Sequence, residues 1–248
     1  MIQIRNLHVR AKHVLLHDVN LSLPAHRFIC LVGASGSGKT LLLKRLLDRL
    51  PDGISSSGEV ISDEPLRRGL DIGYIPQQYT DAFLPFLTMR QMLRDTYRAH
   101  GRKIDHPYID DVLRTLELDP TWLDRYPAEL SGGQLQRFAI LFAVALKPRL
   151  ILADELTTAL DPVLTRRLLD WLTEYQHQYG ATIVFVTHEL GPALHYGEQL
   201  VLMQDGRIVE TGTPQMIEQS RHPFTMSLMQ AHRTSLEERK SSCHQSYP

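Results

Sequence analysis

A glycine-rich stretch that ends in a lysine and a hydroxyl is the first feature of the sequence suited to chemistry. The pattern G-x-x-x-x-G-K-[ST] is fitted by Gly33, Ala34, Ser35, Gly36, Ser37, Gly38, Lys39 and Thr40. The glycines let consecutive backbone N–H groups face one phosphate at the positive end of the following helix. Lys39 would then reach the β- and γ-phosphates, and the Thr40 hydroxyl would hold Mg²⁺. The alternative, a flexible Ser/Gly linker, leaves the apolar strand before the loop and the leucine-rich helix after it unexplained.

Two carboxylates and a histidine follow later apolar runs of the chain. Asp154 and Glu155 end the run 150–153, and His188 follows the run 182–186. Because the carboxyl ends of parallel strands meet at one edge of a sheet, we expect these side chains beside the same crevice. Asp154 would point toward Mg²⁺, and Glu155 would accept a proton from an attacking water. Taken singly, each is open to a plainer interpretation, as a solvated acidic turn or a surface histidine.

A second helix start also has the features of an anion site. It consists of Leu130 followed by Ser131, Gly132, Gly133 and Gln134. Ser131 is a predicted N-cap, and the backbone N–H groups of the glycines face outward at the helix start. This helix end has no phosphate of its own to bind.

Short apolar runs and amphipathic segments alternate along the chain and must position these residues. We expect strands at 2–9, 14–23, 28–32, 72–75, 150–153, 182–186, 199–203 and 207–209. Helices are expected at 41–50, 109–116, 131–146 and 164–175, and another near 189. This order predicts an α/β fold with right-handed crossovers and a mainly parallel sheet. The tail turns polar after about His232 and is expected to fray.

Length and composition exclude several classes of protein. The chain has 248 residues, 43% of them hydrophobic, and a formal net charge of −1. The length suits one large domain, or one domain with a subdomain. Near-neutral charge predicts no nonspecific binding of nucleic acid. Two cysteines, Cys30 and Cys243, cannot staple a secreted domain, and no apolar run approaches the roughly 20 residues of a membrane span.

The order of these motifs resembles the ATP-binding-cassette (ABC) ATPases over nearly the whole chain. The resemblance implies a P-loop NTPase (RecA-like) core with an N-terminal antiparallel β part and an inserted α-helical subdomain. It places the core at 1–77 and 138–231, the helical subdomain at 78–137 and a polar tail at 232–248. It also implies that two cassettes pack head to tail, so that Ser131, Gly132, Gly133 and Gln134 close over ATP held by the partner. Gln77 would sense Mg²⁺ and the membrane subunit, Asp161 would shape the interface between cassettes, and His188 would contact the γ-phosphate.

Flanking stretches resemble the importer cassettes for oligopeptides, dipeptides and nickel, with the nickel or metal-chelate branch most similar. They are Gly73–Gln77 with Ala82–Pro85, Tyr126–Glu129, and Gly206–Gly212 with His222–Thr225. The implied function is ATP hydrolysis coupled to uptake through a bacterial importer, at the cytoplasmic face of the cell membrane. The implied partners are a second ABC ATPase subunit, two transmembrane permeases and, indirectly, a substrate-binding protein, with no nucleic acid. The second cassette is either an identical chain or, as the resemblance favours, a related one.

Some positions depart from the family pattern, and two other functions stay open. Leu156 stands where a proline is usual, and Thr158 where a serine is usual. No aromatic residue lies at 10–13 to stack on adenine, so Arg10 or His13 is the expected substitute. The apolar stretch 83–87 is either subdomain core or a groove for a permease helix. The alternatives are a soluble ABC ATPase of DNA repair, translation or iron–sulfur assembly, and a cassette that binds nucleotide without hydrolysing it.

Overall fold

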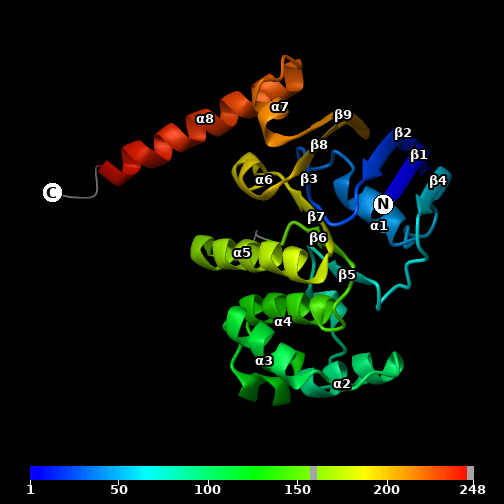
Figure 1. Ribbon diagram of the computed structural model, residues 1–248, viewed down its shortest axis with the longest axis vertical. Helices are drawn as coiled ribbons and strands as arrows, with labels where there is room; N and C mark the ends of the chain where they lie inside the picture. Colours follow the sequence, from blue (N-terminus) through cyan, green and yellow to red (C-terminus); the bar gives the residue numbers. More distant parts are fainter. Residues whose placement is uncertain (157–160, 245–248) are drawn as a thin grey trace.

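Two β-sheets surrounded by helices make up the computed structural model of the protein, which describes residues 1–156 and 161–244 (Figure 1). The larger sheet has the strand order β5-β6-β7-β3-β8-β9. Its strands are β3 (Phe28–Val32), β5 (Ile72–Ile75), β6 (Leu150–Asp154), β7 (Thr182–Thr187), β8 (Gln199–Gln204) and β9 (Arg207–Gly212). All neighbours are parallel except β8 and β9, which are antiparallel. The mainly parallel sheet predicted from the alternating pattern is therefore confirmed.

The three central strands are buried along their whole length because one face of the sheet packs against helices, and the other packs against the first two strands of the chain and the helix that follows β3. Every residue of β3, β6 and β7 is buried, which explains their continuous apolar runs. In the ladder, Phe185 of β7 lies opposite both Cys30 of β3 and Ala153 of β6. This register brings the carboxyl ends of the three strands to one edge of the sheet.

A smaller antiparallel sheet carries the N-terminus. It has the order β2-β1-β4, with β1 (Ile2–Arg10), β2 (Val14–Leu23) and β4 (Ser55–Ser62). Apolar residues of β1 and β2 alternate toward the core, as the period-two pattern predicts. The sequence pattern did not predict β4, which is mostly exposed and pairs with β1.

Helices flank the larger sheet and form a separate group at one end of the molecule (Figure 1). They are α1 (Lys39–Leu46), α2 (Met89–Ala99), α3 (His106–Thr115), α4 (Gly132–Val144), α5 (Pro162–Tyr179), α6 (Leu190–Tyr196), α7 (Pro214–Glu218) and α8 (Pro223–His244). The 3₁₀ turns are η1 (Thr80–Ala82), η2 (Pro120–Asp124) and η3 (Pro127–Glu129). The group at the end comprises α2, α3 and α4. The predicted boundaries between core and helical subdomain stay a prediction.

Tyrosine hydroxyls hold the carboxyl end of α4. Tyr97 of α2 donates to the carbonyl of Ala145 at 2.5 Å, and Tyr108 of α3 donates to that of Val144 at 2.9 Å. Tyr175 of α5 donates to the carbonyl of Pro148 at 3.0 Å. A helix leaves its last carbonyls without partners inside the helix, and the hydroxyls of Tyr97 and Tyr108 supply partners from two other helices, whereas that of Tyr175 holds the segment after α4.

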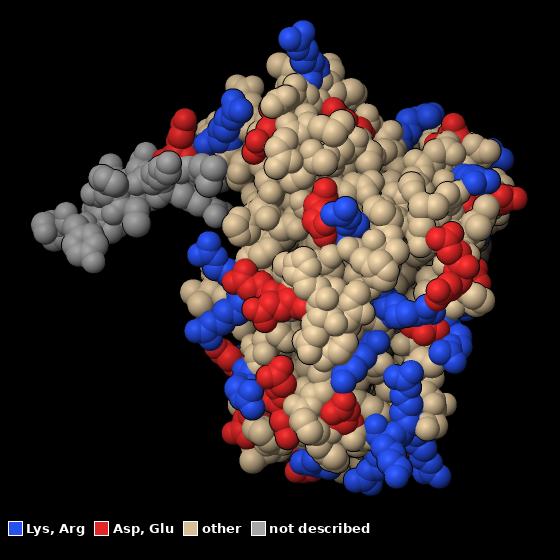
Figure 2. Space-filling view, viewed as in Figure 1, with Lys and Arg blue, Asp and Glu red and all other residues tan. Residues whose placement is uncertain are grey.

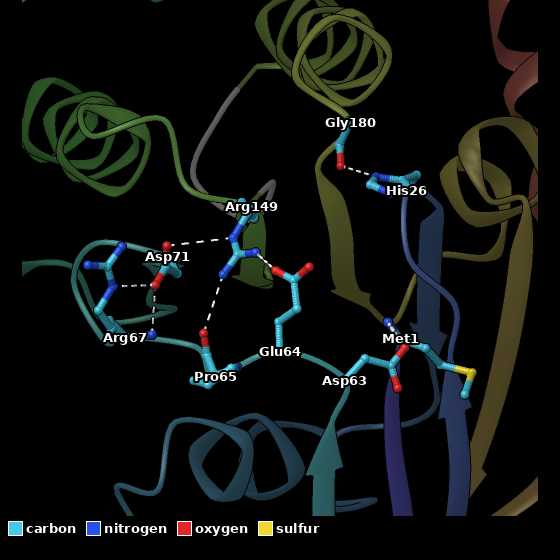
Figure 3. A network of polar contacts seen from close by, with 9 residues as sticks. All are labelled: Met1, His26, Asp63, Glu64, Pro65, Arg67, Asp71, Arg149 and Gly180. Carbon is cyan, nitrogen blue, oxygen red and sulfur yellow. Dashed lines mark hydrogen bonds and ion pairs between the residues drawn. The ribbon is translucent and has the colours of Figure 1, made fainter.

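Arg149, just before β6, joins this strand to the connection between β4 and β5 (Figure 3). Its guanidinium pairs with Glu64, donates to the carbonyl of Pro65 at 3.3 Å and lies 3.6 Å from Asp71. Asp71 also accepts hydrogen bonds from the backbone and side chain of Arg67, both at 2.9 Å. The network fixes the start of the strand that carries Asp154 at its other end.

The C-terminal segment differs from the frayed tail predicted after His232. Helix α8 continues to His244 and extends away from the rest of the fold (Figure 1). Its polar residues include Glu, Arg and Lys, which are strong helix formers, and this accounts for the difference.

No helix in the described ranges is long and apolar enough to cross a membrane. Acidic and basic side chains are mixed over the face in Figure 2, with Lys and Arg gathered near α2 at the lower right.

Candidate functional site

The glycine-rich loop between β3 and α1 has a backbone that requires glycine at defined positions. Gly38 has φ +102°, and a Cβ on it would lie 2.5 Å from a methyl carbon of Leu16. A Cβ on Gly33 would lie 2.2 Å from the carbonyl oxygen of Met203. Larger residues are therefore excluded where the loop passes β2 and β8, and the loop leads directly into the N-terminus of α1.

The turn between β8 and β9 supports this loop from outside. The backbone N–H of Gly206 donates to the carbonyl of Ser37 at 3.1 Å, and the carbonyl of Gly206 accepts from His17 at 2.8 Å. The hairpin turn at Asp205 and Gly206 is therefore also a brace for the phosphate loop.

Lys39 lies inside the loop, with only 4% of its side chain exposed. Its ammonium donates to the carbonyls of Gly33 and Ala34, both at 2.8 Å, and lies 4.0 Å from the carboxylate of Glu155. Burial lowers the pKa of Lys39, and the charges of Glu155 and Asp154 oppose that shift. The loop thus holds a cation at its centre, as binding of phosphates requires.

A hydroxyl and a carboxylate meet next to the loop. The Thr40 hydroxyl donates to Oδ1 of Asp154 at 3.1 Å, and the hydroxyl of Tyr74 lies 3.5 Å from Oδ2. Asp154 is fully buried, and burial raises its pKa. Hydroxyl and carboxylate oxygens are the ligands that Mg²⁺ prefers, so the donor set of Thr40 and Asp154 fits this ion.

Glu155 is the point at which the remaining predicted groups converge. Its carboxylate accepts a hydrogen bond from the Gln77 amide at 2.8 Å and lies 3.8 Å from Nδ1 of His188. The backbone of Glu155 has φ +48°, in the left-handed region, and its N–H donates to Val186 at 3.0 Å. Non-glycine residues adopt this conformation at a cost of about 1–3 kcal/mol, and such residues cluster at functional sites.

A cavity of about 370 Å³ opens over the loop and is lined by five of the eight predicted phosphate-loop residues. Its lining is formed by Leu15, Ser35, Gly36, Gly38, Lys39, Thr40, Leu41, Lys44, Pro51, Gln77 and Glu155. The described residues of the lining do not include Gly33, Ala34, Ser37, Asp154 or His188. Leu15 is the apolar contributor from β2, and neither Arg10 nor His13 is among the lining residues that the structure describes.

Two other predicted groups lie outside this cavity. Ser131 and Gln134 form a reciprocal capping box at the start of α4, with hydrogen bonds of 3.3 and 2.8 Å. Among the described residues, none of those at 131–134 lines the cavity. Asp161 caps α5 by accepting from the N–H groups of Val163 and Leu164, both at 3.0 Å. Leu160 and Thr158, next to Asp161 in the expected interface loop, lie outside the described residues.

Sequence reasoning did not assign Tyr74 and Leu15 to the site. Tyr74 lies in β5, two residues before Pro76 and three before Gln77. The alternation of a strand would have placed its side chain on the face opposite Ile75. No local signal points to Leu15, because an apolar residue in a strand is ordinarily part of a core.

Comparisons with known proteins identify the family of the chain. The family model for the ABC transporter matches residues 16–158. The carnitine transport ATP-binding protein OpuCA of Listeria monocytogenes is 33% identical over 208 residues, 82% of this chain and 52% of that protein. The choline transport ATP-binding protein OpuBA of Bacillus subtilis is 36% identical over 208 residues, 80% of this chain and 53% of that protein. The chain therefore spans about half the length of the curated relatives it matches.

Solved structures with the same fold include a bacterial ABC transporter cassette, MJ0796, in dimeric form. It has a TM-score of 0.75 and 28% identity, and the match covers 86% of this chain and 99% of that one. The same cassette in a post-hydrolysis state bound to ADP and Pi has a TM-score of 0.73 and 28% identity. The relatives named above are ATP-binding proteins of carnitine and choline transport, and their names do not support the predicted nickel or peptide branch. The family match over more than half of the sequence shows that this chain belongs to the ABC transporter family.

Proposed function

We propose that the chain binds and hydrolyses ATP as the energy-coupling subunit of an ABC importer. One observation carries the proposal: the Glu155 carboxylate lies in the phosphate-loop cavity, in contact with Gln77 and 4.0 Å from Lys39. A cassette that only binds nucleotide has no need of this carboxylate.

The phosphates of ATP would bind over the loop. The backbone N–H groups of residues 33–40 and the ammonium of Lys39 would hold the phosphate oxygens. Thr40 and Asp154 would hold Mg²⁺, together with Gln77 as predicted from the sequence. When bound, Mg²⁺ neutralises charge on the phosphates.

Hydrolysis would depend on three side chains around one water. Glu155 would accept the proton of the attacking water, because its carboxylate faces the cavity from the edge of β6. Gln77 would orient this carboxylate through its amide N–H. His188, 49% exposed and 3.8 Å from Glu155, would contact the terminal phosphate.

A second cassette would complete each site. The outward-facing start of α4, with Ser131, Gly132, Gly133 and Gln134, lies apart from the chain's own cavity among the residues described. It would cover ATP held by a partner, with Asp161 at the interface. The related cassette solved as a dimer supports this arrangement. Because ATP would bind the closed dimer and not the open one, it would shift the equilibrium toward closure.

A groove beside Gln77 is the proposed docking place for a permease helix. It has a volume of about 550 Å³ and is lined by Phe83 and Leu84 as well as Pro76. Phe83 is buried, whereas Leu84 and Phe86 are 50% and 70% exposed. The sequence left open whether the stretch 83–87 is subdomain core or a groove for a permease helix. Its buried residue Phe83 fits the first interpretation, and the exposed residues Leu84 and Phe86 fit the second. This docking would hold the chain at the cytoplasmic face of the membrane.

The cargo has two candidate classes. The names of the curated relatives favour carnitine, choline or glycine betaine. The flanking motifs, such as Tyr126–Glu129 and His222–Thr225, favour nickel, a metal chelate or peptide. The two classes are separated by measuring uptake of each compound in cells with and without the chain. If uptake of one class is lost without the chain, that class is the cargo. If uptake of neither class is lost, the importer role is contradicted.

The enzymatic proposal is tested with two substitutions at the site and one matched control. Glu155→Gln should keep ATP binding while lowering hydrolysis about 100-fold or more, because the proton acceptor is lost. Lys39→Ala should weaken ATP binding itself. Glu174→Gln makes the same change on the exposed face of α5 and should leave both quantities unaltered. Wild-type rates of hydrolysis in Glu155→Gln would refute the role of Glu155.

A further inference from the structure

Gln136, in the second turn of α4, lies between this helix and the segment that carries Glu155. Its side chain is 3% exposed, and its amide nitrogen donates to the carbonyl of Leu156 at 2.7 Å. Leu156, which follows Glu155, is itself 1% exposed. The contact therefore joins two buried groups that are 20 residues apart in sequence.

The backbone around Glu155 is held from both sides. The N–H of Glu155 donates to the carbonyl of Val186 in β7, and the carbonyl of the following residue, Leu156, accepts from the amide of Gln136 in α4. Between these two bonds Glu155 has the left-handed φ of +48°. A conformation of this kind persists in a non-glycine residue when the surroundings determine it, and these two hydrogen bonds do so.

The amide of Gln136 is not fully satisfied by this arrangement. A carbonyl oxygen can only accept a hydrogen bond, so the amide nitrogen must face Leu156. The amide oxygen is then buried, and it has no hydrogen-bond partner within the described part of the chain. Burial of an unpaired oxygen lowers stability, so the contribution of Gln136 to folding does not explain the residue.

We propose that Gln136 is a positioning residue that fixes the Glu155 carboxylate from the helix that begins with Ser131. The proposal rests on the proposed ATP hydrolysis. Five residues separate Ser131 from Gln136, which is roughly 7–8 Å along a rigid helix. A shift of the start of α4 against a partner's nucleotide would therefore be passed through Leu156 to Glu155.

The test compares Gln136→Met with Gln176→Met in the full-length chain. Gln176 is a matched control because it is 4% exposed and donates to the carbonyl of His26 at 2.8 Å, away from the cavity. Gln136→Met should lower kcat about 10- to 100-fold, as expected when a catalytic group is misplaced by about 1 Å. It should leave the KM for ATP and ATP-driven dimerisation within twofold of wild type. Gln176→Met should lower the melting temperature without this loss of kcat.

A double variant separates action through Glu155 from a general structural effect. If Gln136 acts through Glu155, Gln136→Met should lower the residual rate of Glu155→Gln less than twofold. Equal losses of kcat in wild-type and Glu155→Gln backgrounds would overturn the proposal. Unfolding of Gln136→Met at a temperature where Gln176→Met is folded would also overturn it, since Gln136 would then be structural.

Failure of the inference is distinguishable from failure of the proposed function. A wild-type rate in Gln136→Met, with Glu155→Gln impaired, refutes the inference alone. Wild-type hydrolysis in Glu155→Gln refutes the proposed role on which the inference rests.

Discussion

Removal of the Tyr97 hydroxyl is a sensitive test of how the carboxyl end of α4 is held. In Tyr97→Phe the ring stays in place, and only the donor to the carbonyl of Ala145 is lost. The described residues contain no second donor to this oxygen. Tyr108→Phe deletes the same atom, but the carbonyl of Val144 keeps a hydrogen bond of 2.9 Å from the N–H of Lys147. Tyr97→Phe therefore leaves the carbonyl of Ala145 without a hydrogen-bond donor among the described residues, whereas Tyr108→Phe leaves the carbonyl of Val144 with one.

The expected magnitudes follow from this difference. A net hydrogen bond contributes about 1 kcal/mol, whereas a buried carbonyl left without a partner costs about 1–3 kcal/mol. We expect Tyr97→Phe to lower the free energy of unfolding by about 2 kcal/mol and Tyr108→Phe by about 1 kcal/mol. In a chain of this length these values correspond to about 4–8 °C and about 2–4 °C in melting temperature.

Urea unfolding followed by circular dichroism measures both free energies, and calorimetry measures the melting temperatures. Tyr126→Phe is the control because its side chain is 44% exposed, and it should lie within about 0.5 kcal/mol of wild type. A cost for Tyr97→Phe equal to or below that for Tyr108→Phe would refute the reasoning, since it would mean that the unpaired carbonyl of Ala145 has no cost.

Two further predictions concern the supports of the site. Because its hydrogen bond with Arg67 holds the pKa of Asp71 below its usual range, this carboxylate stabilises the fold above about pH 4 and progressively less as the pH falls through its lowered pKa. Urea titrations should show Asp71→Asn about 1 kcal/mol less stable than wild type at pH 7, with the difference vanishing in acid. Gly206→Ala should lower the melting temperature and weaken ATP binding, because its Cβ would lie 2.2 Å from the carbonyl of Leu15 at φ +74°. Gly53→Ala has a similar φ of +78° with open space around it, and it should leave ATP binding intact; weak binding in both variants would contradict the brace.

The parts of the fold that sequence reasoning predicted are those with a strong local pattern. The run before Gly33 and the run ending at Asp154 are apolar throughout, and both form buried parallel strands. Their carboxyl ends lie at the same edge of the sheet, on either side of β7, which explains why Thr40 and Asp154 were expected together. The Thr40 hydroxyl lies 3.1 Å from Oδ1 of Asp154. Strand β4 had no such pattern, because its serines face solvent and pairing with β1 alone determines its conformation.

The contacts between distant segments could not be predicted in the same way. Gln136 is an ordinary polar residue in a helical pattern, and only the packed structure shows its bond to Leu156. Likewise, the bond of Gly206 to Ser37 depends on how β8 lies beside β3. Local periodicity predicts elements, whereas these bonds depend on the tertiary arrangement.

The place of β3 in the larger sheet has a consequence during protein synthesis. This strand leaves the ribosome before both of its neighbours, β7 and β8, which follow about 150 or more residues later. At about 5–20 residues per second, the apolar segment Phe28–Val32 waits roughly 8–30 s for its first hydrogen-bonded neighbour in the sheet. During that interval it is a segment that chaperones would be expected to bind, and the phosphate loop that follows it lacks the bond between Ser37 and Gly206 of the turn after β8.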